Sequence, residues 1–125
     1  MADGDKRKGP EKRRHRRLET NIEATIRLAD QDDADPIKVT ITNLGPEGAF
    51  VRTETLLPIQ SKVALEFKLD SYPREIDVVA TILWERRAEG SQGMGMHFTR
   101  IPLFEKNVII DYILRRYAEF HSGRP

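Results

Sequence analysis

The feature of the sequence that most constrains its fold is a period-two alternation of apolar and polar residues, which recurs in short segments between residues 20 and 100. In the first segment Ile22, Ala24, Ile26 and Leu28 alternate with polar side chains. Successive side chains of a strand point to opposite faces, so each such segment predicts a half-buried β-strand. The expected strands cover residues 20–28, 37–42, 49–53, 62–69, 75–86 and 93–98.

Glycine, proline, asparagine and aspartate gather between these segments and predict the turns. The connection from Asn43 to Gly48 contains two glycines and a proline, which favours a tight turn with at least one positive φ. In the segment 75–86 the alternation places Trp84 on the same face as the aliphatic residues that precede it. In the last segment, Gly93 and Gly95 are expected to let another backbone approach closely.

The apolar period changes from two to that of a helix after Pro102, where Phe104, Val108 and Tyr112 recur at every fourth residue. We expect this helix to cover about residues 102–120 and to present these three side chains to the core. The predicted class is mainly β: a small six-stranded antiparallel split β-barrel with a C-terminal α-helix and a flexible basic N-terminal arm. Residues 1–11 are expected to form a disordered tail, and residues 12–121 the domain.

The composition excludes several classes of function. The chain has no cysteine, which removes disulfides, thiolate nucleophiles and cysteine-bound metals, and its histidines, His15, His97 and His121, are scattered. No acid–base pair, nucleophile motif or phosphate loop is present, so we expect no enzyme, no metal site and no cofactor. The sequence also lacks a signal peptide and an apolar run long enough to cross a bilayer, which predicts a cytoplasmic protein without membrane insertion.

Charge is distributed unevenly along the chain. Residues 1–17 contain eight basic and three acidic side chains, whereas the chain as a whole has a net charge of only +1. A basic arm on a mildly acidic body indicates an anionic partner that contacts the arm. A solvated tail without a ligand is the alternative.

Two segments carry residues that folding alone does not require. Arg13, Arg14 and Arg17 lie directly before the first strand, and Asn43 and Gly48 bound the turn after the second strand. In an antiparallel pair the chain enters the first strand at the end where it leaves the second, so we expect the two segments to meet. The arginine guanidinium makes bidentate hydrogen bonds to phosphate oxygens and to the O6 and N7 edge of guanine, which favours a guanine nucleotide as ligand.

In these motifs the sequence resembles the PilZ domain, a bacterial receptor module for cyclic di-GMP. The family pattern R-x-x-x-R, followed by [D/N]-x-S-x-x-G, is matched by Arg13 and Arg17 and by Asn43 and Gly48. The resemblance extends from about Lys12 to Arg116 and includes the Gly-Met-Gly-Met-His-Phe strand at residues 93–98. It departs at one position, because Gly45 replaces the serine of the second motif.

The resemblance implies a role for each matched residue. Arg13 and Arg17 would clamp guanine and phosphate groups, and Arg14 would add charge at the rim. Asn43 would hydrogen-bond a guanine edge, and Gly48 would keep the turn open to the ligand. Trp84 stands where many members carry an aromatic residue, and two roles remain open for it, beside the ligand or in the core. Loss of the serine hydroxyl costs on the order of 1 kcal/mol of binding free energy, which weakens binding and need not end it.

The resulting hypothesis is a single-domain cyclic di-GMP receptor that relays the signal to an unidentified protein effector in motility, biofilm or exopolysaccharide control. The arm would fold over the nucleotide when it binds. The receptor is expected to be a monomer or a weak dimer. Two alternatives remain: a degenerate PilZ adaptor that binds protein but no nucleotide, and a nucleic-acid-binding barrel. The nucleic-acid-binding barrel is less favoured because the strands show few exposed aromatic residues on a common basic face.

Overall fold

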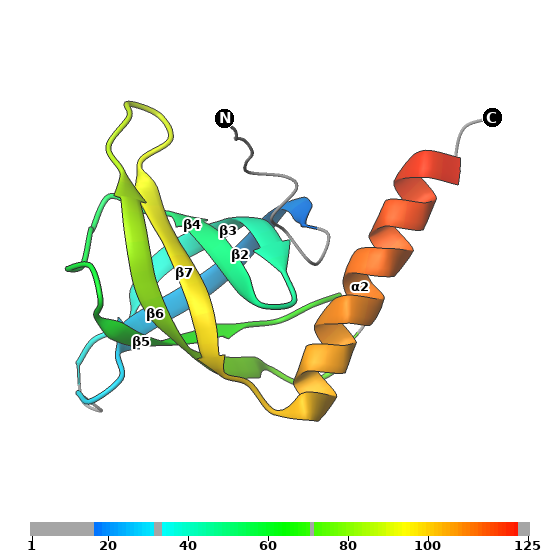
Figure 1. The fold of residues 1–125 in the computed structure, drawn as a ribbon, viewed down its shortest axis with the longest axis horizontal. Helices are drawn as coiled ribbons and strands as arrows, with labels where there is room; N and C mark the ends of the chain where they lie inside the picture. Colours follow the sequence, from blue (N-terminus) through cyan, green and yellow to red (C-terminus); the bar gives the residue numbers. More distant parts are fainter. Residues whose placement is uncertain (1–16, 32–33, 71, 123–125) are drawn as a thin grey trace, which may run out of the picture.

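The computed structural model describes residues 17–31, 34–70 and 72–122, and within them the predicted class is confirmed. Six antiparallel strands close into a barrel and one helix follows them (Figure 1). With the labels of Figure 1, the elements are β2 (Leu18–Leu28), β3 (Ile37–Gly45), β4 (Gly48–Arg52), β5 (Lys62–Phe67), β6 (Ile76–Arg86), β7 (Gly93–Arg100) and α2 (Leu103–Ser122). The predicted strands and helix all occur, with ends shifted by a few residues.

The barrel follows the order β2-β3-β4-β7-β6-β5, and β5 pairs with β2 to close it. Each pair of neighbours is antiparallel. Closure leaves none of these strands as an unpaired edge. It also places β4 between β3 and β7, so that the outer faces of β3, β4, β7 and β6 form one continuous surface.

The alternating apolar side chains fill the barrel, as the sequence pattern predicts. Fully buried members come from all six strands and include Ile26, Ile41, Leu65, Ile82 and Met94. A side chain of this kind contributes about 1.5–3 kcal/mol when it is transferred from water to the core, so the pattern accounts for the stability of the barrel. Most aliphatic residues are therefore structural.

Helix α2 extends beside the barrel in Figure 1 and contacts it along one face. Ile109, Tyr112 and Ile113 are the buried side chains of this face. Phe104 was expected to join them, but its side chain is 60% exposed and its ring packs against Tyr72 with centroids 6.0 Å apart. Helix α2 begins at Leu103, so Phe104 lies in its first turn, which extends past the edge of the barrel core.

Polar contacts tether α2 in its first turn and in its second half. The Tyr72 hydroxyl donates to Glu105 Oε2 at 3.1 Å near the start of the helix. In the last turns Arg116 Nη2 donates to Asp70 Oδ2 at 2.6 Å. Tyr72 and Asp70 belong to the segment between β5 and β6, so this segment and the helix hold each other in place.

Strand β6 contains an irregularity that the sequence pattern does not reveal. The pairing with β7 shifts between Ile82 and Trp84, so that Ile82 faces Met96 and Trp84 faces Gly95. Ile82 remains in the core, whereas the Trp84 side chain is 44% exposed. The prediction that Trp84 shares the inner face is therefore wrong, because a bulge changes the face on which the following residues lie.

Candidate functional site

The predicted meeting of the arm and the β3–β4 hairpin is confirmed for Arg17. Strand β2 starts at Leu18, directly after Arg17, and its first residues pair with the end of β3: Leu18 with Leu44 and Glu19 with Asn43. Arg17 Nη1 donates a hydrogen bond to Asn43 Oδ1 at 3.3 Å. A guanidinium fork and a carboxamide, both half-buried, thus lie together on the outside of the barrel.

Gly48, the first residue of β4, lies beside these two side chains. A Cβ atom on Gly48 would lie 3.5 Å from Arg17 Nη2 and only 2.5 Å from the Met96 carbonyl oxygen. The missing side chain therefore allows β4 to lie close to β7 while the guanidinium lies over it. Arg17, Asn43 and Gly48 come from three different strands or strand ends, and we call them the arginine corner.

Two further predicted residues, Arg13 and Arg14, lie outside the described residues. Their role in the site stays a prediction. Arg17 shows where the chain enters the barrel, at the end of β2 that borders β3.

The turn between β3 and β4 is shorter than predicted. Strand β3 continues to Gly45 and pairs it with Gly48, which leaves Pro46 and Glu47 as the connection. The expected positive φ in this segment does not occur; among the described residues it is found at Gln60 and Gly90. Close strand packing, rather than a left-handed turn residue, accounts for Gly48, where a Cβ atom would lie 2.5 Å from the Met96 carbonyl oxygen.

The hairpin is also fixed on its far side. The Phe98 amide of β7 donates to the Glu47 carbonyl oxygen at 2.8 Å. Lys106 Nζ of α2 lies 3.9 Å from Glu47 Oε2. The arginine corner is thus attached through one loop to both β7 and the first turns of α2.

A groove of about 1480 Å³ begins at Arg17 and extends over β2 toward α2. Its walls are of mixed charge, with Glu19, Glu23 and Glu66 among the acids and Arg17 and Arg116 among the bases. Asn43 and Gly48 do not line it. Because its five acidic and five basic side chains balance, the groove offers no net positive charge, and the arginine corner fits an anionic ligand better.

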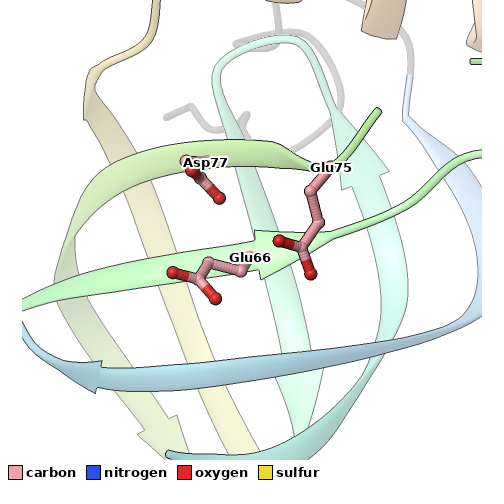
Figure 2. Close-up of side chains that lie close together, drawn as sticks. All are labelled: Glu66, Glu75 and Asp77. Atoms are coloured by element: carbon pink, nitrogen blue, oxygen red, sulfur yellow. The ribbon is translucent and has the colours of Figure 1, made fainter. Parts of the chain in front are cut away.

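Three carboxylates gather elsewhere on the barrel, at Glu66 of β5 and at Glu75 and Asp77 around the start of β6 (Figure 2). Their nearest oxygens lie within 4.8 Å of one another. Glu66 pairs with Asp77 across the two strands and lies 3.6 Å from Arg27 Nη2. The pattern within a single strand does not reveal this group, because cross-strand register brings it together. Exposed carboxylates with a neighbouring arginine do not by themselves define a metal site.

Among the described residues, no helix has both the length and the apolar character needed to cross a membrane.

Comparison with known proteins assigns the family. The family model described as PilZ domain matches residues 11–115 of the chain. The chain therefore belongs to the PilZ domain family. A search of curated proteins found no match.

Solved structures of PilZ proteins have the same fold at low sequence identity. The Bacillus subtilis inhibitor of motility, MotI, superposes with a TM-score of 0.75 at 15% identity over 91% of this chain, which spans 54% of the MotI chain. The PilZ domain of Escherichia coli YcgR, solved with c-di-GMP, gives 0.65 at 16% identity, with 91% and 99% of the two chains covered. The PilZ domain of CeSA from a cellulose-synthesizing bacterium gives 0.58 at 20% identity, with 82% and 98% covered.

Proposed function

We propose that this chain is a non-enzymatic receptor for cyclic di-GMP that binds the nucleotide at the arginine corner. The observation that carries the proposal is the contact of the Arg17 guanidinium with the Asn43 carboxamide over Gly48. Arginine offers paired donors to phosphate oxygens or to guanine O6 and N7, and a carboxamide offers both a donor and an acceptor to a base edge. Family membership and the c-di-GMP named for the YcgR domain support the same ligand.

Arg13 and Arg14 belong to this proposal as additional cations of the arm. Two arginines four residues apart can contact two sides of one ligand, and a cyclic dinucleotide carries two phosphates. Binding would bring the arm onto the outer surface of β3 and β4, where Asn43 and Gly48 lie. The surface formed in this way would be read by a separate protein effector in motility, biofilm or exopolysaccharide control.

The test is isothermal titration calorimetry of the full chain with cyclic di-GMP, with GTP as the nucleotide control. We expect saturable binding in the micromolar range or tighter. Arg17→Ala should weaken binding by about 30- to 150-fold, because hydrogen bonds to a charged group contribute about 2–3 kcal/mol. Arg115→Ala is the matched control, since Arg115 is an exposed cation of α2 that pairs with Asp111 at 2.8 Å. Equal affinities for the two variants would contradict the proposal.

The nucleotide-free adaptor is the second candidate, and Gly45 is the observation that favours it, since the motif serine is absent. Gly45→Ser distinguishes the two. In a receptor, the added hydroxyl should tighten binding by about fivefold, because one hydrogen bond contributes about 1 kcal/mol. A wild-type protein without measurable heat of binding, together with a Gly45→Ser variant that binds, would assign the adaptor role to the natural chain.

A further inference from the structure

A second cluster lies on the outer surface of the barrel, beside the arginine corner. The rings of Phe50 and Trp84 are stacked, with centroids 5.2 Å apart and an interplanar angle of 26°. Phe50 is only 6% exposed, yet it is not part of the barrel core, whereas its neighbours Ala49 and Val51 are. Alternation along β4 therefore directs Phe50 outward, where Trp84 covers it.

The glycines of β7 create the space for these rings. A Cβ atom on Gly95 would collide with the Trp84 indole, and one on Gly93 would lie 2.7 Å from the Phe50 ring. Met94 and Met96, which alternate with the two glycines, point into the core and are buried. The Gly-Met-Gly-Met sequence thus produces a flat outer surface on which two aromatic rings lie. At Gly93 it also allows the predicted close approach of another backbone, that of β4.

Arg86 lies on these rings. Its Cζ atom is 4.6 Å from the Phe50 centroid and 5.7 Å from the Trp84 centroid. The side chain is exposed, and within the described part of the chain no carboxylate forms an ion pair with it. The next residue, Arg87, differs because its Nε atom is 2.8 Å from Glu85 Oε2. Arg86 therefore presents a positive charge that the described residues leave without a counterion. We call Phe50, Trp84 and Arg86 the outer aromatic cluster.

Strand register joins this cluster to the arginine corner. Asn43 pairs with Phe50, Phe50 with Gly95, and Gly95 with Trp84, so the four positions form one row across β3, β4, β7 and β6. Neighbouring strands are about 4.8 Å apart, which places Gly95, under the indole, about 10 Å from Asn43 along the row. This distance is comparable with the size of one cyclic dinucleotide, which has two purine bases.

We propose that Trp84 and Arg86 hold the second guanine of the nucleotide whose first guanine contacts Arg17 and Asn43. The inference rests on the proposed function and extends its site across two more strands. The exposed indole face stacks on the base, and the Arg86 guanidinium donates to the O6 and N7 edge. Phe50 supports both groups from below. The site is thereby selective for a ligand with two linked purines over a mononucleotide.

The chain contains one tryptophan, so its fluorescence reports on this cluster alone. We would titrate the full chain with cyclic di-GMP while recording Trp84 emission, and measure the same affinities by calorimetry. We expect quenching that saturates together with the calorimetric binding curve. Arg86→Ala should weaken binding by about tenfold, and Arg86→Lys should restore only part of the affinity because it keeps the charge but loses the planar fork. GMP should bind wild type and Arg86→Ala equally weakly.

Arg87→Ala is the control, because Arg87 adjoins Arg86 in the chain but pairs with Glu85. Circular dichroism of each variant checks that the barrel is intact. Wild-type binding that is lost in Arg17→Ala but equal in Arg86→Ala and Arg87→Ala, with unchanged Trp84 emission, would overturn this inference and leave the proposed function standing. Absence of wild-type calorimetric binding would overturn both.

Discussion

Two arginines of this chain lie on aromatic rings, and their surroundings differ. Arg116 of α2 lies with its Cζ atom 4.9 Å from the Tyr112 centroid and is paired with Asp70 at 2.6 Å. Arg86 of β6 lies at 4.6 Å from the Phe50 centroid, and no ion pair joins it to a described carboxylate. The same contact geometry therefore serves two purposes. A neutralised guanidinium fastens a helix to the barrel, and one without a counterion is available to an anionic ligand.

The rings beneath the two arginines are also held differently. Phe50 and Trp84 lie over glycines of β7, so backbone spacing fixes their positions. Tyr112 is part of the helix face that packs on the barrel and is 7% exposed. We therefore expect the outer aromatic cluster to be sensitive to any added side chain in β7, and the contact at α2 to depend on its polar tether.

The largest effect is expected when a single methyl group is added at the base of the outer aromatic cluster. In Gly93→Ala the new Cβ collides with the Val51 carbonyl oxygen and lies 2.7 Å from the Phe50 ring. Backbone atoms cannot rotate away, so we expect the free energy of unfolding to fall by about 2–3 kcal/mol. Urea unfolding measures this change.

Gly90→Ala is the control for that substitution. Gly90 has a φ of 83°, and nothing lies within 4 Å of its Cβ position. Its cost of about 1 kcal/mol arises from backbone conformation alone. If Gly93→Ala were no more destabilising than Gly90→Ala, the aromatic rings would not depend on the close packing of β4 on β7.

The arginine corner and the outer aromatic cluster also differ in how far the sequence predicts them. Alternation predicted the strands and the inner residues because it depends only on the repeat of neighbouring side chains. Chain direction in an antiparallel pair was enough to bring Arg17 to Asn43, which are 26 residues apart. Neither argument needs knowledge of the other strands.

The outer aromatic cluster depends on information that a single strand does not carry. Trp84 was assigned to the wrong face because a bulge follows Ile82. Phe50 and Arg86 were not singled out, since their contact requires β4 to lie next to β7, and β7 next to β6. Two glycines alternating with buried methionines were the available signal, and they indicated close approach without identifying which groups approach.

The second prediction compares the removal of each of the two arginines that lie on aromatic rings. Arg116→Ala should lower the free energy of unfolding by about 0.5–1 kcal/mol, as expected for a partly exposed ion pair with ring contact, and leave nucleotide affinity unchanged. Arg86→Ala should change affinity and leave stability within about 0.5 kcal/mol of wild type. Urea unfolding and calorimetry on both variants give the four values. A loss of affinity in Arg116→Ala equal to that in Arg86→Ala would remove the distinction between the two sites.

The smallest effect concerns the pH dependence of the helix contact. Burial raises the pKa of Tyr112 above 10.0, with Asp70 adding to the rise and Arg116 opposing it. The folded state thus favours the neutral hydroxyl more than the unfolded state does. The stabilisation is fully present below the unfolded pKa and is lost as the pH rises through the folded pKa. Tyr112→Phe lacks this titration, so its stability relative to wild type should improve above about pH 10.

Urea unfolding of wild type and Tyr112→Phe at about pH 8 and about pH 11 tests this expectation through the difference between the two proteins. The other titrating groups are common to both proteins and cancel in that difference. Tyr72→Phe is the control, because the Tyr72 hydroxyl donates to Glu105 in the first turn of the helix, away from Tyr112. If the difference in free energy of unfolding between Tyr112→Phe and wild type were the same at both pH values, Tyr112 would ionise as readily in the folded protein as in the unfolded chain. The contact between Arg116 and Tyr112 would then be open to water, as the Trp84 side chain is.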